Sequence, residues 1–162
     1  MEIWDAYDGD FNRIEGATLV RGEAIPEGMY HLVCDVLVRH ADGEYLLMQR
    51  DFRKSHGGMW EASAGGAALR GETPPECARR ELREETGIAA EALTELCRVV
   101  NPETRSIYVG FLCVTDCAKD SITLQEGETV AWRWVGREAL LGMQDDELLG
   151  KRIYRYVGEL CE

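Results

Sequence analysis

Runs of apolar residues along the chain predict a domain in which strands outnumber helices. Short runs rich in branched and aromatic side chains, bounded by turn residues, are typical of strands. The sequence predicts strands over Tyr30–Arg39, Tyr45–Gln49, Met59–Ala64, Leu93–Val100, Ile107–Val114 and Thr129–Val135. The Asp42-Gly43 pair between the first two predicts a hairpin turn. The shorter segment Ile122–Leu124 is also strand-like.

One helix is marked at both ends by the sequence itself. Thr73 followed three residues later by Glu76 forms a capping box, and Pro74 suits the first helical turn. Gly87 suits the left-handed residue that follows a helix end. The predicted helix therefore spans Pro74–Thr86.

This predicted helix should pack on a sheet through one edge. Ala78 and Leu82 form that apolar edge. Arg79, Arg83 and Thr86 should point away to solvent. The remaining side carries acidic residues and is free to face a cleft.

Two further helices are expected near the end of the chain. Glu138–Met143 should form a short helix. Apolar residues then repeat at helical spacing at Leu149, Ile153, Tyr156 and Leu160. This pattern predicts an amphipathic closing helix. No repeat, low-complexity tract or linker divides the chain, so residues 1–162 are expected to form one domain.

Three carboxylates crowd one side of the predicted helix Pro74–Thr86. Glu81, Glu84 and Glu85 stand at i, i+3 and i+4, a spacing that projects them from one face. Like charges there are unfavourable unless a cation neutralises them. Hard oxygen ligands in this arrangement suit Mg²⁺ or Mn²⁺, ions that serve phosphate chemistry. The segment therefore predicts a metal-dependent enzyme.

Segment 66–88 resembles the Nudix box. The pattern of that box is Gly, five residues, Glu, seven residues, then Arg-Glu-aliphatic-any-Glu-Glu-any-Gly-aliphatic. Its specified positions are filled here by Gly66, Glu72, Arg80, Glu81, Leu82, Glu84, Glu85, Gly87 and Ile88. The resemblance implies a Nudix-type α/β/α sandwich with a mixed β-sheet. It also implies hydrolysis of a diphosphate linkage in a nucleoside diphosphate or a nucleoside diphosphate conjugate.

The resemblance further implies a role for each residue of the box. The implied metal ligands are Glu81, Glu84, Glu85 and the backbone carbonyl of Gly66. Arg80 would orient a glutamate by an ion pair, and Glu72 would fix the loop or join the metal network. In this family, water activated by the metals attacks one phosphorus. Members differ in which glutamate acts as the base, so that role is left open.

Composition and charge narrow the class of partner. The chain of 162 residues carries a formal net charge of −12, which disfavours nucleic acids and anionic membranes. A small diphosphate substrate stays compatible with that charge, because bound cations dominate the local field. The chain has no apolar run long enough to span a membrane and no signal-peptide layout, so a cytoplasmic enzyme is expected. A homodimer is compatible with the resemblance, although the sequence does not fix the oligomeric state. The six cysteines show no metal-binding spacing, and Cys34, Cys77 and Cys113 are expected to be core residues.

The N-terminal half is also similar to the branch of the family related to isopentenyl diphosphate isomerase. The similar segments are Trp4–Asp8, Ile25–Gly28, Tyr30–Val33, Gln49–Arg50 and Gly58–Glu61. That isomerase has a catalytic cysteine just before the box glycine and a metal-binding histidine just after it. This chain has Gly65 and Ala67 in those places, although His31 matches a further histidine of the isomerase metal site. Trp4 is expected to anchor an edge strand.

Hydrolysis is favoured over two alternatives. Isomerisation needs a proton donor and acceptor around the double bond, and the thiol is missing. A non-catalytic nucleotide-binding module would usually have a damaged box, whereas this box is intact.

Substrate contacts are expected from loops around the box. The candidates are Arg50, Arg53, Trp60, Glu126 and Glu128. An arginine beside the cleft would pair with phosphate oxygens, and a glutamate in the loop after Leu124 would supply a metal ligand or base. For the charged candidates the alternative is an ordinary solvated residue or a polar turn.

Overall fold

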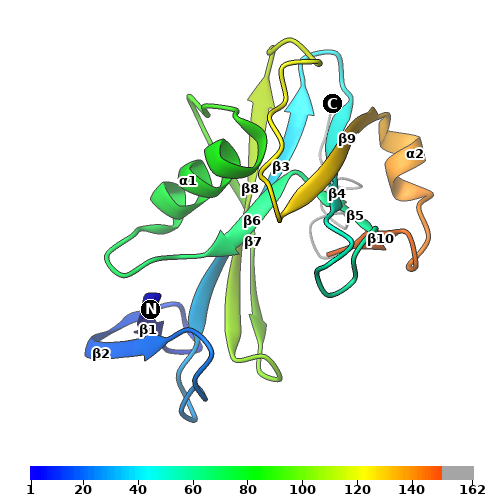
Figure 1. Ribbon diagram of the computed structural model, residues 1–162. Coiled ribbons are helices and arrows are strands. Elements are labelled where there is room, and N and C mark those ends of the chain that lie inside the picture. The colour runs from blue at the N-terminus through cyan, green and yellow to red at the C-terminus, as the bar shows by residue number, and fades with distance from the viewer. Residues whose placement is uncertain (151–162) are drawn as a thin grey trace.

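The computed structural model describes residues 1–150 as a mixed β-sheet with helices on both faces and an N-terminal hairpin at one end (Figure 1). The strands are β1 (Ile3–Tyr7), β2 (Arg13–Val20), β3 (His31–His40), β4 (Tyr45–Arg50), β5 (Trp60–Ala62), β6 (Ala64–Ala67), β7 (Thr94–Asn101), β8 (Ser106–Thr115), β9 (Thr129–Val135) and β10 (Leu148–Leu149). The helices are α1 (Pro74–Thr86) and α2 (Arg137–Leu141). The α/β sandwich expected from the sequence is confirmed. No helix within residues 1–150 is long and apolar enough to cross a membrane.

Strand β3 organises the larger sheet. It pairs in parallel with β8 along its whole length, from His31 to His40, and β7 lies antiparallel to β8. On its other edge, β3 pairs with β6 over Val33–Val36 but with β4 only at Arg39. Strand β4 pairs in turn with β5 and β9. The sheet therefore divides along this edge of β3.

Ser63 lies at the point where the sheet divides. Its backbone has φ of 35°, in the left-handed region. Its buried hydroxyl accepts a hydrogen bond from the Val38 N–H at 2.7 Å and donates one to the Leu46 carbonyl at 3.0 Å. The side chain thus takes the place of a ladder bond between β3 and β4. The prediction of one strand over Met59–Ala64 is wrong, because the chain pairs with β4 as β5, turns at Ser63 and pairs with β3 as β6.

Side chains of the central strands alternate between two cores, one on each face. The core beneath α1 includes Val36, Val38, Leu46 and Met48, with Ala78 and Leu82 from the helix. The core beneath α2 includes Leu37, Tyr45, Leu47 and Leu112, with Leu140 from the helix. The predicted apolar edge of α1 is confirmed by this packing.

Helix α1 begins and ends where the sequence predicts. The Thr73 backbone N–H and hydroxyl both donate to the Glu76 carboxylate, each at 2.8 Å. Gly87 follows the helix with φ of 77° and donates its N–H to the Arg83 carbonyl at 2.9 Å. Local side chains and one glycine therefore define both ends of the helix that carries the box.

Thr86 is buried rather than solvent-facing, so that part of the helix prediction is wrong. Its hydroxyl donates to the Leu82 carbonyl at 2.6 Å, and its own carbonyl accepts the Thr123 N–H at 2.9 Å. The segment before β9 covers the end of the helix. Ile122 of that segment is buried in the core beneath α1, and Ile122–Leu124 is not a strand.

Two expectations for the end of the chain need correction. The short helix is Arg137–Leu141 rather than Glu138–Met143. Leu149 lies in β10, which pairs in parallel with β5, and not at the start of a helix. The remaining positions of the expected closing helix, Ile153, Tyr156 and Leu160, lie outside the described residues.

The N-terminal hairpin β1–β2 forms a second, two-stranded sheet. Trp4 anchors its edge strand as predicted, with 7% of its surface exposed. Tyr7 and Tyr30 exchange two backbone hydrogen bonds of 2.9 Å, which join the hairpin to the start of β3. The Asp5 carboxylate accepts the Gly71 N–H at 2.8 Å, which joins the hairpin to the loop before α1. Strand β2 was not predicted, because half of its residues are exposed and its apolar pattern is weak.

Replacing Ser63 by Ala should destabilise the fold by about 1–3 kcal/mol, because the Val38 N–H would lose its buried acceptor. The free energy of unfolding from urea denaturation measures this change. The matched control is Ser121→Ala, at an exposed serine whose hydroxyl also donates to a backbone carbonyl. A loss for Ser63→Ala no larger than that of the control would contradict this role.

Candidate active site

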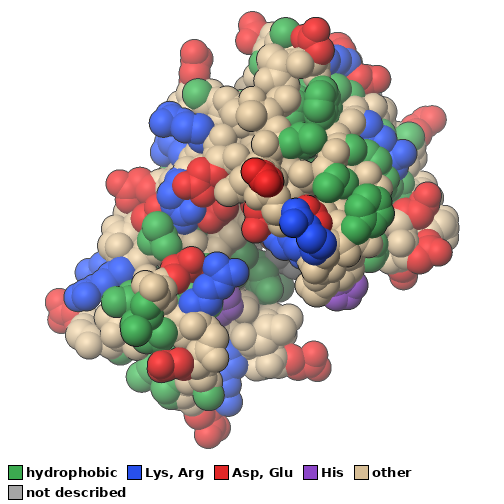
Figure 2. Space-filling view, viewed as in Figure 1, with side chains coloured by type: hydrophobic (Ala, Val, Ile, Leu, Met, Phe, Trp, Pro, Cys, Tyr) green, Lys and Arg blue, Asp and Glu red, His purple; other side chains and the backbone are tan. Residues whose placement is uncertain are grey.

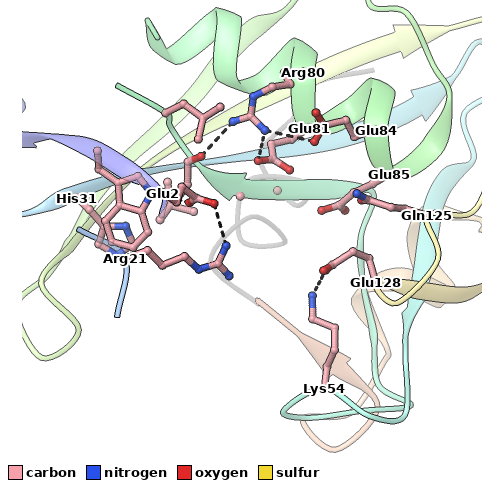
Figure 3. Close-up of a pocket in the computed structure, with 16 residues that line it drawn as sticks. Glu2, Arg21, His31, Lys54, Arg80, Glu81, Glu84, Glu85, Gln125 and Glu128 are labelled. Atoms are coloured by element: carbon pink, nitrogen blue, oxygen red, sulfur yellow. Dashed lines mark hydrogen bonds and ion pairs between the residues drawn. The ribbon is translucent and has the colours of Figure 1, made fainter. Parts of the chain in front are cut away.

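The acidic side of α1 faces a cleft of about 410 Å³. Glu81, Glu84 and Glu85 line it from the helix (Figure 3), and Gly66 of β6 also lines it. The surface is hollowed here, and acidic and basic side chains gather around the hollow (Figure 2). We refer to this cavity as the acidic cleft. Gly66 and the three glutamates are separated in the sequence but line the same cleft.

Arg80 holds the acidic residues of the box together. Its guanidinium donates to both carboxylate oxygens of Glu72, at 2.6 and 2.9 Å. It also donates to Glu81 at 2.7 Å and to Glu84 at 3.3 Å. The Ala67 carbonyl accepts a further bond at 3.1 Å. One cation therefore contacts three carboxylates and the strand opposite them.

The pKa values reflect this arrangement. The hydrogen bond from Arg80 holds the pKa of Glu72 below its ordinary value. Burial raises the pKa of Glu81, and Arg80 only partly offsets that effect. Burial also raises the pKa of Glu85 well above its ordinary value, and the neighbouring Glu61 and Glu81 raise it further. Glu85, with 7% of its surface exposed, is thus a buried carboxylate among other carboxylates.

Gly66 permits the close approach of β6 to α1. A Cβ atom on this residue would overlap the Glu81 carboxylate, so no other residue fits without displacing that side chain. The Cys77 thiol lies 3.6 Å from the Gly66 carbonyl oxygen, as a weak donor. Cys77 itself is fully buried, as expected for a core cysteine.

The donor set suits a hard divalent cation. Glu81, Glu84, Glu85 and the Gly66 carbonyl could supply oxygen ligands, since all four residues line the cleft, and the crowding around Glu85 is the kind that a cation relieves. Within residues 1–150 no three ligating side chains converge closely enough to hold an ion as they stand. Glu81 and Glu84 are instead turned toward Arg80. Each of these carboxylates bonds to Arg80 through one oxygen, so an ion would be held by the second oxygen or would displace Arg80.

The opposite wall of the cleft carries two cations that the sequence analysis missed. Arg21 follows β2 and pairs with Glu2 at 3.1 Å. Lys54 lies in the loop between β4 and β5 and forms an ion pair with Glu128 (Figure 3). All four residues line the cleft. The position of Arg21 follows from strand β2, whose apolar pattern in the sequence is weak. Lys54, by contrast, lies four residues after the candidate Arg50 and could have been found from that position.

His31 also lines the cleft, but its ring is already engaged. Nε2 lies 2.6 Å from the Ser106 hydroxyl, and Trp4 stacks on the ring with 4.4 Å between centroids. Nδ1 is buried and has no hydrogen-bond partner among the described residues. Burial and the nearby Arg21 lower the pKa of His31. The histidine therefore joins β3, β8 and the hairpin.

The five candidates for substrate contact are distributed unevenly. Glu128 lines the acidic cleft. Arg50 donates to both oxygens of Glu61, at 3.1 and 2.9 Å, and lines an adjoining cavity. Arg53, Trp60 and Glu126 line neither of these cavities. Arg53 is engaged by Asp51, and Trp60 lies beneath the Arg133 guanidinium.

The adjoining cavity, which we call the side cavity, has a volume of about 530 Å³. It is lined by Asp35, Arg50, Glu61, Thr104 and Tyr108 among others, and it shares Val33, Gly65 and Gly66 with the acidic cleft. A Cβ atom on Gly65 would lie 2.5 Å from the Asp35 carboxylate. The position before the box glycine therefore has no room for a larger side chain unless Asp35 moves.

Comparison with known proteins agrees with the box. The family model of the NUDIX domain matches residues 29–156. A Listeria monocytogenes protein described as an uncharacterized Nudix hydrolase is 30% identical over 141 residues, which are 86% of this chain and 83% of that protein. An isopentenyl-diphosphate Delta-isomerase of Burkholderia multivorans is 33% identical over 131 residues, which are 75% of this chain and 71% of that protein.

The fold has a close counterpart among solved structures. The crystal structure of DR0079 from Deinococcus radiodurans superimposes with a TM-score of 0.75, covering 99% of this chain and 100% of that one at 20% identity. That likeness concerns the fold alone. The family model, by contrast, spans most of the chain and includes the whole box on α1, and on this basis the chain belongs to the Nudix family.

Proposed function

We propose that this protein is a hydrolase that uses Mg²⁺ or Mn²⁺ to cleave a diphosphate linkage in a nucleoside diphosphate or a nucleoside diphosphate conjugate. The observation that carries the proposal is the acidic cleft itself. Glu81, Glu84 and the buried Glu85 face it from one helix, and Arg21 and Lys54 face it from the other side. A diphosphate needs cationic side chains near its oxygens, and its metal counterions need carboxylate ligands.

The metal ligands in this proposal are Glu81, Glu84, Glu85 and the Gly66 carbonyl. The ion would neutralise charge on the phosphoryl oxygens and activate the attacking water. Arg80 would hold protein groups in place rather than contact the substrate. Its bonds to Glu72 and Ala67 fix the loop and β6, and it would remain on Glu72 when Glu81 turns to the metal.

The basic wall would bind the substrate. Arg21 and Lys54 now pair with Glu2 and Glu128, and a diphosphate would compete for them through charge-assisted hydrogen bonds. Release of Lys54 would free the Glu128 carboxylate inside the cleft. Glu128 would then join Glu81, Glu84 and Glu85 among the cleft carboxylates that could accept a proton from the attacking water.

Replacing Glu84 or Glu85 by Gln should reduce metal-dependent phosphate or nucleotide release by about a hundredfold or more, since even indirect changes at metal sites reach this scale. Steady-state assays over a panel of nucleoside diphosphates and their conjugates, with Mg²⁺ and Mn²⁺, measure the loss. Glu76→Gln is the matched control on the same helix, because glutamine also completes a capping box. Absence of any metal-dependent cleavage by the wild type would refute the proposed activity.

Replacing Glu85 by Gln should also stabilise the metal-free protein. Because the folded-state pKa of Glu85 is raised above 4.5, its destabilising effect is absent below that pH, grows as the pH rises above it, and reaches its full size once the pH exceeds the folded-state value. In EDTA at pH 8, the variant should therefore have the larger free energy of unfolding, by about 1.4 kcal/mol for each unit of pKa shift.

The same variant should lose stabilisation by metal. Millimolar Mn²⁺ should raise the Tm of the wild type and leave that of Glu85→Gln nearly unchanged, because a ligand stabilises only the state that binds it. The exposed Glu91→Gln is the control and should behave as wild type in both experiments. Equal Mn²⁺ shifts in wild type and Glu85→Gln would remove Glu85 from the metal site.

Isomerase activity is the competing proposal, because one relative of this chain is an isopentenyl-diphosphate Delta-isomerase. Two observations argue against it. Gly65 supplies no thiol and has Asp35 beside it, and His31 is held by Ser106 and Trp4. Incubation with isopentenyl diphosphate and Mg²⁺ should therefore give no dimethylallyl diphosphate, as followed by chromatography beside an active isomerase. Formation of that product at a comparable rate would overturn the assignment as a hydrolase.

A further inference from the structure

The N-terminal hairpin contributes side chains to the acidic cleft that the family resemblance does not account for. The family model matches residues 29–156, whereas Glu2, Trp4 and Arg21 precede that segment and line the cleft. The Arg21 side chain extends along one side of the cleft, beside Glu2 (Figure 3). The hairpin therefore adds charged groups to the site from outside the matched domain.

Glu2 and Arg21 are fixed relative to each other through both backbone and side chain. The Arg21 backbone N–H donates to the Glu2 carbonyl at 3.0 Å. One oxygen of the Glu2 carboxylate accepts a hydrogen bond from the Arg21 guanidinium at 3.1 Å, and the other accepts the indole N–H of Trp4 at 2.7 Å. Because each carboxylate oxygen has its own partner, Glu2 holds Arg21 without releasing Trp4.

Trp4 connects Glu2 to the main sheet. The Trp4 side chain is buried and stacks on the ring of His31 with 4.4 Å between centroids. His31 in turn lies 2.6 Å from the Ser106 hydroxyl at the start of β8. The place of the Glu2 carboxylate is therefore set by contacts that lead into the sheet.

The two ion pairs of the cleft differ in this respect. Within residues 1–150, the Glu128 carboxylate contacts Lys54 and no second side chain. A phosphate that reaches Lys54 would therefore displace Glu128. Arg21 bonds to Glu2 through Nη1 alone, so its remaining N–H groups can donate to a phosphate while Glu2 stays in place.

Glu2 can influence anion binding by Arg21 in two opposite ways. Its charge competes with an anion for the guanidinium and weakens binding, whereas its hydrogen bond orders the guanidinium and strengthens binding. The pair is exposed, with 68% of the Arg21 side chain and 29% of the Glu2 side chain accessible, so water and salt screen the effect of charge. Ordering a long side chain before the ligand arrives removes an entropic cost from binding. Ordering is therefore the larger effect.

We propose that Glu2 is a positioning residue that holds the Arg21 guanidinium toward a diphosphate in the acidic cleft, and that Trp4 holds Glu2 in turn. This inference rests on the proposed function, because it assumes that the cleft binds a diphosphate. The N-terminal hairpin is then part of the binding site, and its docking through Trp4 contributes to affinity for the substrate.

The test measures binding of a diphosphate analogue that cannot be hydrolysed. Isothermal titration with methylenediphosphonate and Mg²⁺ compares the wild type with Glu2→Gln, whose side-chain carbonyl still accepts the Trp4 N–H but which offers Arg21 no second acceptor. Glu2→Gln should weaken binding by about five- to tenfold, the factor expected when one long side chain is no longer ordered. Arg21→Ala should weaken it at least as much, and adding Glu2→Gln to Arg21→Ala should change the affinity by less than about twofold.

Glu23→Gln is the matched control, because it removes the same charge at an exposed residue that does not line the cleft. It should bind the probe as the wild type does. Tighter or unchanged binding by Glu2→Gln would overturn the positioning role, and so would an equal loss in the Arg21→Ala background.

Two further outcomes separate this inference from the proposed function. Absence of probe binding by the wild type, with either Mg²⁺ or Mn²⁺, would overturn the diphosphate site and the role of Glu2 together. The expected coupling of Glu2 to Arg21, without cleavage of any nucleoside diphosphate or conjugate in the substrate panel, would retain the role of Glu2 and overturn the proposed hydrolysis.

Discussion

The division of one sheet edge is the constraint on which the rest of the site depends. Strand β3 is paired throughout with β8, but its other edge is shared between β4 and β6. Two strands cannot occupy the same edge, so they part, and the Ser63 hydroxyl satisfies the backbone groups at that point. Strand β6 is thereby free to run beneath α1, with Gly66 against Glu81. Both cavities adjoin this strand.

The same geometry concentrates negative charge. Bringing α1 down on two glycines buries Glu85 and half-buries Glu81, while Glu61 approaches from β5. Arg80 balances part of this charge through Glu72, Glu81 and Glu84. Glu85 makes no ion pair with Arg80, and burial outweighs the influence of Lys54 on its pKa. The raised pKa of Glu85 thus follows from packing, and the proposed cation would offset the burial of this carboxylate.

The sequence predicts features whose signals are local. The ends of α1 are encoded by Thr73, Glu76 and Gly87, each within a turn of the helix, and the box fixes which side chains share one face. Features that depend on distant segments could not be found in this way. Thr86 is buried because Thr123 crosses the helix end, β5 and β6 separate because they pair with different strands, and Arg21 reaches the cleft through a hairpin with little apolar pattern. Arg21 was missed for this reason.

Similarity to an isomerase and the proposal of hydrolysis concern different parts of the chain. Similarity over most of the sequence reports the shared sheet and helix, whereas chemistry depends on a few positions beside the box glycine. At one of these, Gly65 leaves space that the Asp35 carboxylate approaches closely. A thiol there and a carboxylate at Asp35 would compete for the same volume, so the two residues have to be interpreted together. Gly65 therefore leaves the site without a proton donor at this position.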